Sequence, residues 1–134
     1  MKRNEAMDVY KGRLEKFKNT QSIQWKMNLS IWTLLALAIY YNGPINKLNT
    51  CFLLFLLGSI CVIHFCYCLK TQESLNDDKA VNDDIVKRLN KKKKRVKVRF
   101  TKKGEFSLTS FYWIILQTAI TGVLVALIFF QSYS

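Results

Sequence analysis

The residues of this chain best suited to metal or redox chemistry lie in one apolar segment. Cys61, His64 and Cys68 are spaced three and four residues apart, so a helix would place all three side chains on one face. Thiolate and imidazole groups are the usual protein ligands of zinc, but structural zinc sites use a closed set of four. Cysteine is also a common small side chain in buried helices. We therefore expect no metal and no cofactor on this face.

No catalytic arrangement accompanies this cysteine and histidine face. His64 is the only histidine in the chain. The sequence has no glycine-rich phosphate loop, no nucleophile elbow and no zinc-protease helix. The acidic residues are grouped in a charged segment, where ordinary solvation explains them. We expect a protein that is not an enzyme.

Three apolar segments would hold these residues, and charged segments separate them. A transmembrane helix takes roughly 20 apolar residues, and aromatic side chains gather at its two ends. The turn Asn42-Gly43-Pro44 would stop the first helix, because proline cannot continue it. The sequence thus predicts an all-α membrane protein with three transmembrane helices, at 25–41, 49–69 and 108–130.

Basic residues are distributed unevenly around these spans. Of the 21 lysines and arginines, seven lie before residue 27 and thirteen lie within 70–106, while Lys47 is alone in its loop. Basic residues near spans stay on the cytoplasmic side. This predicts a cytoplasmic N-terminus, an external turn at 42–48 and an external tail at 131–134. It also predicts an integral membrane protein whose basic segments are attracted to an anionic inner leaflet.

Polar residues inside the spans fall at similar depth. Counting 1.5 Å per residue from the inner ends places Thr33, His64 and Gln117 in one layer. Intramembrane polar groups usually face the interior of a helix bundle and find partners there. We expect His64 and Gln117 to hydrogen-bond each other as a structural clasp, or to line a narrow polar path.

Small residues in the second and third spans predict close helix contacts. Without a hydrophobic force between helices in lipid, small side chains mark the surfaces where helices approach each other. Such a surface would pack the span inside its own three-helix unit, or else against another subunit. The residues concerned are Gly58, Ser59, Thr118, Gly122 and Ala126.

The cytoplasmic segments are predicted to be helical and charged. Segment 1–24 has the apolar spacing of a basic amphipathic helix, and 70–107 combines a charged helix with a basic arm. The basic residues would set topology and bind lipid, or pair with the acidic ones. Nucleic acid is disfavoured because Phe100 is the one aromatic residue beside them. The residues of this expected contact are Asp77, Asp78, Asp83, Asp84, Lys91, Lys92, Lys93, Lys94 and Arg95.

The order of these parts resembles that of small prokaryotic membrane effectors of the SLATT type. The shared parts are the basic helix Tyr10–Lys18 before the first span, the turn Asn42–Pro44, and the charged helix Thr71–Leu89 after the second span. The third span lies outside the two-span pattern of that class. The resemblance implies an effector that assembles and perturbs the inner membrane when a soluble cytoplasmic sensor protein signals, as in an antiviral defence or toxin system.

Two functions follow from these observations. The first is an oligomeric, pore-forming effector of the inner membrane that assembles as a homo-oligomer. The alternative is a non-conducting membrane anchor or accessory subunit that binds a soluble partner through residues 71–106.

Overall fold

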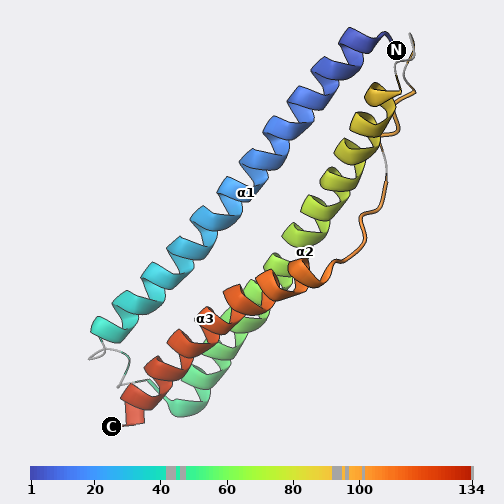
Figure 1. Ribbon diagram of the computed structural model, residues 1–134. Coiled ribbons are helices and arrows are strands. Elements are labelled where there is room, and N and C mark those ends of the chain that lie inside the picture. Colours follow the sequence, from blue (N-terminus) through green and yellow to red (C-terminus); the bar gives the residue numbers. More distant parts are fainter. Residues whose placement is uncertain (42–44, 46–47, 92–94, 96, 101, 134) are drawn as a thin grey trace. The chain divides into compact units, whose positions relative to one another are not determined.

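The part of the protein that the structure describes is built from three helices. The computed structural model describes residues 1–41, 45, 48–91, 95, 97–100 and 102–133. Its helices are α1 (Arg3–Tyr40), α2 (Thr50–Asn90) and α3 (Leu108–Tyr133), and the described residues form no strand (Figure 1). The prediction of an all-α chain is confirmed. The turn predicted at 42–44 lies outside the described residues.

Helices α1 and α2 are each longer than a single span. Each joins a segment predicted as charged and helical to one predicted as a span, and no proline interrupts either helix. Asn49 caps the start of α2, where its side-chain Oδ1 accepts a hydrogen bond from the Cys51 backbone N–H at 2.9 Å. Lys87 and Arg88 lie in the last turn of α2, where positive charge favours the helix dipole.

The chain divides into two compact units. The first, which we call the charged unit, comprises Met1–Ile23 and Thr71–Ser107. The second, the apolar unit, comprises Gln24–Lys70 and Leu108–Ser134. Each unit has its own hydrophobic cluster.

The charged unit is held together by a small hydrophobic cluster between the beginning of α1 and the end of α2. Its buried members are Ala6, Val81, Ile85 and Leu89. The arm that follows α2 forms no strand in its described residues. Val98 nevertheless packs against the cluster, whereas its neighbours Lys97 and Arg99 are exposed.

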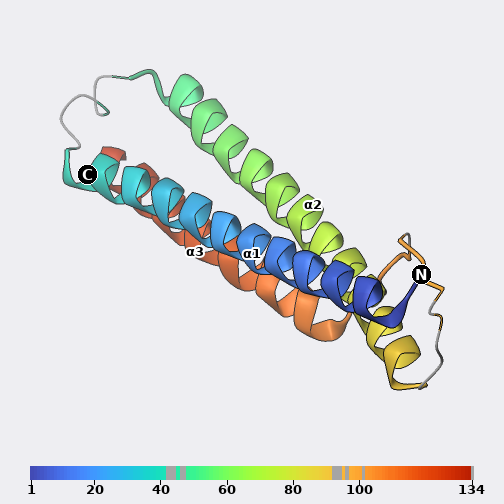
Figure 2. The same cartoon turned by 90° about the horizontal axis from the view of Figure 1, so that it is seen from above.

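The apolar unit is a bundle formed by the end of α1, the beginning of α2 and α3. Figure 2 shows α1 and α3 side by side, and hydrogen bonds between their side chains support that arrangement. Its hydrophobic cluster draws on all three helices. The buried members are Leu35, Leu53, Leu57 and Ile128, each at most 5% exposed.

Two helices are long and apolar enough to cross a membrane. These are α2 and α3, and 22% of the most apolar window of each is buried by the chain. A core helix of a soluble protein would be mostly buried, so these helices present apolar side chains outward. Among the described residues, α1 does not meet the same criterion, because Gln24, Asn28 and Ser30 interrupt its apolar segment.

Candidate functional site

The interior of the apolar unit contains a polar cluster to which all three helices contribute. Its members are buried to at least 96% of their surface, which for ring and amide side chains requires hydrogen-bond partners. They are Gln24 and Asn28 of α1, His64 and Cys68 of α2, and Gln117 and Thr121 of α3.

His64 links all three helices through its two ring nitrogens. Its Nε2 lies 2.9 Å from Asn28 Oδ1, and its Nδ1 lies 2.8 Å from Thr121 Oγ1. Asn28 uses its Nδ2 to donate to Gln117, so its Oδ1 is an acceptor and the Nε2–H of the histidine donates to it. Trp32 Nε1–H donates to Thr121 Oγ1 at 3.0 Å, which leaves the threonine proton for His64 Nδ1. In the neutral form of His64, both ring nitrogens therefore have a hydrogen-bond partner.

Gln117 is the second centre of the cluster. Its Oε1 lies 3.1 Å from Gln24 Nε2, 3.0 Å from Asn28 Nδ2 and 3.3 Å from Cys68 Sγ. Two of these donors belong to α1 and one to α2, while the acceptor belongs to α3. This single amide oxygen therefore joins three helices.

The structure brings His64 and Gln117 into one cluster, but Asn28 and Thr121 stand between them. Thr33, which was predicted for the same layer, is exposed, so its assignment was wrong. Five residues separate Thr33 from Asn28, and in a helix that places it about 140° around the axis, on the outer face. The count of depth alone ignored this angle.

The cluster also includes residues that the depth count missed. Gln24, Asn28 and Trp32 recur at four-residue intervals on α1, and Gln117 and Thr121 do so on α3. Residues four apart share a helix face, so this polar spacing was visible in the sequence.

The four cysteines do not gather at one point. Cys68 is buried and its Sγ lies 3.5 Å from His64 Nε2, whereas Cys61 is half-buried. Cys51 and Cys66 are exposed. Within the described ranges, no three His, Cys, Asp or Glu side chains are placed to hold one metal ion.

Toward the C-terminal end of α3, the interior of the apolar unit is closed by hydrophobic side chains. Leu35, Leu57 and Ile128 follow the polar cluster along their helices and are 3–5% exposed. Close-packed aliphatic groups leave no polar partner for water or an ion. The polar cluster therefore ends at this apolar layer.

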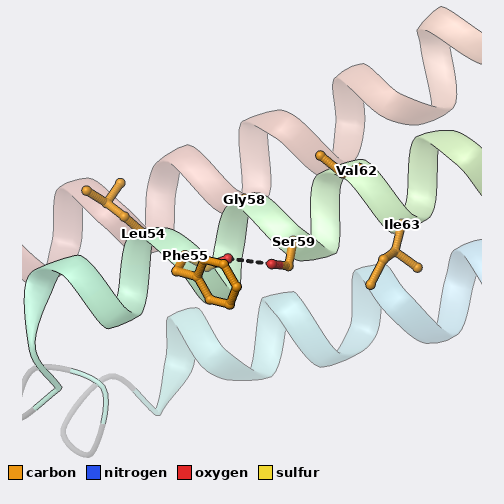
Figure 3. A pocket seen from close by; sticks show the side chains of 6 residues that line it. All are labelled: Leu54, Phe55, Gly58, Ser59, Val62 and Ile63. Carbon is orange, nitrogen blue, oxygen red and sulfur yellow. Dashed lines mark hydrogen bonds between the residues drawn. The ribbon is translucent and has the colours of Figure 1, made fainter.

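An open apolar groove lies on the outer face of α2 around Gly58 (Figure 3). It has a volume of about 440 Å³, and a Cβ atom built on Gly58 would meet nothing within 4 Å. Ser59 Oγ donates to the Phe55 carbonyl at 2.7 Å, so its hydroxyl is satisfied within the helix. The flanking side chains Leu54, Phe55, Val62 and Ile63 are 50–74% exposed.

The small residues of α3 also lie away from close contacts. A Cβ built on Gly122 meets nothing within 4 Å, and Ala126 is exposed. Thr118 Oγ1 donates to the Ile114 carbonyl of its own helix at 2.8 Å. Packing within its own unit therefore does not account for this stripe or for Gly58.

The aspartates of α2 find partners other than the expected basic run. Asp78 Oδ1 accepts from Arg13 Nη2 at 3.0 Å, across 65 residues of sequence, and the side chain is 9% exposed. Asp84 pairs with Arg88 one turn along its own helix at 2.7 Å. Asp77 Oδ1 accepts from the Gly104 backbone N–H at 2.6 Å.

The pairing of the aspartates with the run that starts at Lys91, in the same or another subunit, stays a prediction, because most of that run lies outside the described residues. Within one helix, a side chain meets neighbours that are three or four residues away. Asp78 finds its partner on another helix, because α1 packs against α2 in the charged unit and brings Arg13 to it. Asp83 is exposed, as are Lys91 and Arg95, and a backbone bridge joins Arg95 to Lys2. Lys92, Lys93 and Lys94 lie outside the described residues.

Comparison with known proteins gives no match. No protein-family model, no curated protein and no solved structure matches this chain. A functional assignment therefore rests on three features of the molecule: the buried polar cluster, the outward apolar groove and the ion-paired charged unit.

Proposed function

We propose that this chain is an integral membrane protein with three spans, a cytoplasmic N-terminus and an external C-terminus. The support is the inverted distribution of side chains in the apolar unit. Its interior holds His64, Asn28 and Gln117, while residues such as Phe55 and Leu108 are more than 70% exposed. A soluble domain would have the opposite arrangement, and exposed apolar surface of this extent matches lipid.

The first span would be the end of α1, even though its average polarity is high. The polar side chains Gln24 and Asn28 face inward, whereas Leu29, Leu34 and Leu37 are 48–67% exposed. The polar residues thus form hydrogen bonds inside the bundle, and the outer face of the helix is apolar. We place this helix in the membrane for that reason.

Aromatic contacts favour the same assignment. Trp25 stacks edge-on against both Trp32 and Trp113, at centroid distances of 6.4 and 5.9 Å. Tyr40 and Tyr41 pack together at the other end of α1 at 5.0 Å. Tryptophan and tyrosine at both ends of a span are typical of the two membrane interfaces.

We further propose that the protein is a self-assembling effector of the bacterial inner membrane, which perturbs or permeabilises the bilayer. The observation that supports assembly is the groove at Gly58. Glycine within a helix costs about 1 kcal/mol relative to alanine, and no described residue fills the space that Gly58 leaves. In lipid, small residues on an outer face mark the approach of another helix.

Permeation would require several copies. The polar cluster of one copy ends at the apolar layer that contains Leu35, Leu57 and Ile128, so a single bundle is sealed. An effector of this class would open a path between subunits. The resemblance to SLATT-type effectors is consistent with this mode of action, in which a soluble sensor protein supplies the signal.

Assembly is tested by filling the groove. Gly58→Leu should leave the fold intact, because its side chain meets open space, and should convert oligomers into monomers. Ala36→Leu, on the exposed face of α1, is the matched control and should change nothing. The measurement is the subunit number in nanodiscs by single-molecule photobleaching. A wild-type protein that is monomeric at every density would refute the proposal.

The topology is tested by labelling with a membrane-impermeant maleimide. In spheroplasts, the exposed native Cys51 should react from outside. In a variant with Cys51→Ser and Glu105→Cys, residue 105 should react only after the membrane is permeabilised. The reverse pattern would contradict the proposed orientation.

The alternative function, a non-conducting anchor for a soluble partner, is favoured by the exposure of the basic arm. Lys97, Arg99 and Lys102 are exposed on the segment that follows α2. An anchor would co-purify with a soluble protein and lose it when residues 71–106 are replaced, with no leak in either case. A leak that persists after this replacement would exclude the anchor as the main role.

A further inference from the structure

The charged unit contains a cleft of about 450 Å³ that belongs to neither the polar cluster nor the groove. Three separate segments of the chain form its walls. α1 provides Arg13 and Lys16, α2 provides two aspartates and a valine, and the arm after α2 provides one aromatic and two basic residues. These residues of α2 and the arm are Asp77, Asp78, Val81, Phe100, Lys102 and Lys103.

Specific contacts fix this cleft. The Gly104 backbone N–H donates to Asp77 Oδ1 at 2.6 Å, and a Cβ on Gly104 would overlap the backbone carbonyl of Asn76. Only glycine permits this approach, so the arm is seated against α2 directly beside Lys102 and Lys103. On the opposite wall, the Arg13–Asp78 pair joins α1 to α2 at 3.0 Å.

The cleft has a surplus of positive charge. Four of the lining side chains are cationic and two are anionic. Both carboxylates already have a partner in the protein, one in Gly104 and the other in Arg13. Lys102 and Lys103 form no salt bridge within 4.0 Å in the part of the chain that the structure describes. A surplus of two positive charges equals the charge that a phosphate monoester brings at neutral pH, about −2.

Two buried atoms on the wall lack hydrogen bonds. Arg13 Nε, a donor, and Asp78 Oδ2, an acceptor, have no hydrogen-bond partner among the described residues. Asp78 is 93% buried, and Lys16 Nζ forms an ion pair with its Oδ2 at 4.0 Å. Arg13 Nε and Asp78 Oδ2 are closed to solvent, so a ligand in the cleft would meet the exposed Lys16, Lys102 and Lys103 instead.

We propose that this cleft binds a phosphate monoester attached to an organic group. The phosphate oxygens would accept from the exposed ammonium groups of Lys16, Lys102 and Lys103. Phe100, which is 53% exposed, provides an apolar wall for the rest of the ligand. The chemistry is shared by soluble sugar phosphates and by phosphorylated lipid headgroups. The site does not depend on assembly through Gly58.

Binding is measured with the full chain in phosphatidylcholine nanodiscs at physiological salt. The soluble probes are ribose 5-phosphate, ribose and inorganic phosphate, and the lipid probe is dioctanoyl phosphatidylinositol 4-phosphate. The double variant Lys102→Gln/Lys103→Gln removes two cleft cations. Lys97→Gln/Arg99→Gln removes the same charge from exposed positions of the same arm and is the matched control.

Ribose should not bind, because the charge-assisted hydrogen bonds go to the phosphate. Ribose 5-phosphate or the phosphoinositide should bind at least about tenfold more tightly than inorganic phosphate, because its organic group adds a contact with Phe100. The cleft variant should weaken binding about tenfold or more, and the control variant by less than about twofold. If only ribose 5-phosphate binds tightly, the natural ligand is a soluble phosphate ester. If only the phosphoinositide binds tightly, the natural ligand is a lipid headgroup. Equal losses in the two variants, or no binding of either probe, would overturn the proposal.

Discussion

The fully buried amide of Asn28 provides the strongest test of the polar cluster. Asn28→Leu keeps a similar volume but removes two hydrogen bonds, at 2.9 Å to His64 and 3.0 Å to Gln117. Gln117 Oε1 retains two donors, Gln24 and Cys68, so it is not left without a partner. The histidine Nε2–H, however, loses its oxygen acceptor and keeps only the weak contact with Cys68 Sγ at 3.5 Å.

The size of the effect follows from this count. A buried donor without a partner costs about 1–3 kcal/mol, and an interhelical hydrogen bond in lipid is worth about 0.6 kcal/mol on average. The leucine gains nothing from burial, because the lipid reference is equally apolar. We therefore expect Asn28→Leu to lower the free energy of unfolding by about 2–3 kcal/mol.

The double variant sharpens this prediction. In Asn28→Leu/His64→Leu the unpaired donor is gone, and the Thr121 hydroxyl can turn to the Gln117 carbonyl 3.3 Å away while it still accepts from Trp32. The double variant should therefore be more stable than the sum of the two single variants predicts, with a coupling of about 1 kcal/mol or more.

The assay is reversible unfolding in mixed micelles, followed by tryptophan fluorescence. Trp25, Trp32 and Trp113 all lie in the apolar unit and Trp25 contacts the other two, so their emission reports its packing. Asn28→Leu with a loss below about 0.5 kcal/mol, together with strict additivity in the double variant, would refute the proposed network.

Three further predictions concern the rest of the chain. Gly104→Ala should release the arm from Asn76, because the added Cβ overlaps that backbone, and limited trypsin digestion should then cut the arm faster. The hydrogen bond from Arg88 lowers the pKa of Asp84 in the folded protein. At pH values above the ordinary carboxyl pKa of about 4, this pair therefore stabilises the charged unit. The stabilisation is lost as the pH falls through the lower pKa of the folded state. Asp84→Asn should remove this part of the pH dependence of unfolding, and an unchanged profile would contradict it. Gly122→Leu should keep the fold, since its side chain meets open space, while a shift in subunit number would assign α3 to the assembly surface as well.

Much of the helical architecture is visible in the sequence, because apolar blocks and charge runs are local signals. Depth counting brought His64 and Gln117 together for the same reason, since rise per residue is fixed in a helix. It misplaced Thr33 because depth omits the angle around the axis. The four-residue spacing of Gln24, Asn28 and Trp32 contains that angle and indicates the cluster.

Contacts between segments that are distant in the sequence could not be predicted from local sequence patterns. Asp78 and Arg13 are 65 residues apart, and their meeting depends on how α1 docks on α2 in the charged unit. The close approach of the arm to Asn76 at Gly104 also depends on how the arm packs against α2. The outward position of Gly58 likewise depends on the packing of three helices together, which no single helix sequence determines.

Dye release from liposomes, measured against the number of protein copies per vesicle, tests the proposed effector most directly. Because one bundle is closed by its apolar layer, release should be negligible at one copy per vesicle and rise more steeply than linearly with density. Gly58→Leu should abolish release at every density, and Ala36→Leu should leave it unchanged. Release proportional to density from a single copy upward, or equal release from Gly58→Leu, would contradict assembly through the α2 groove as the source of permeation.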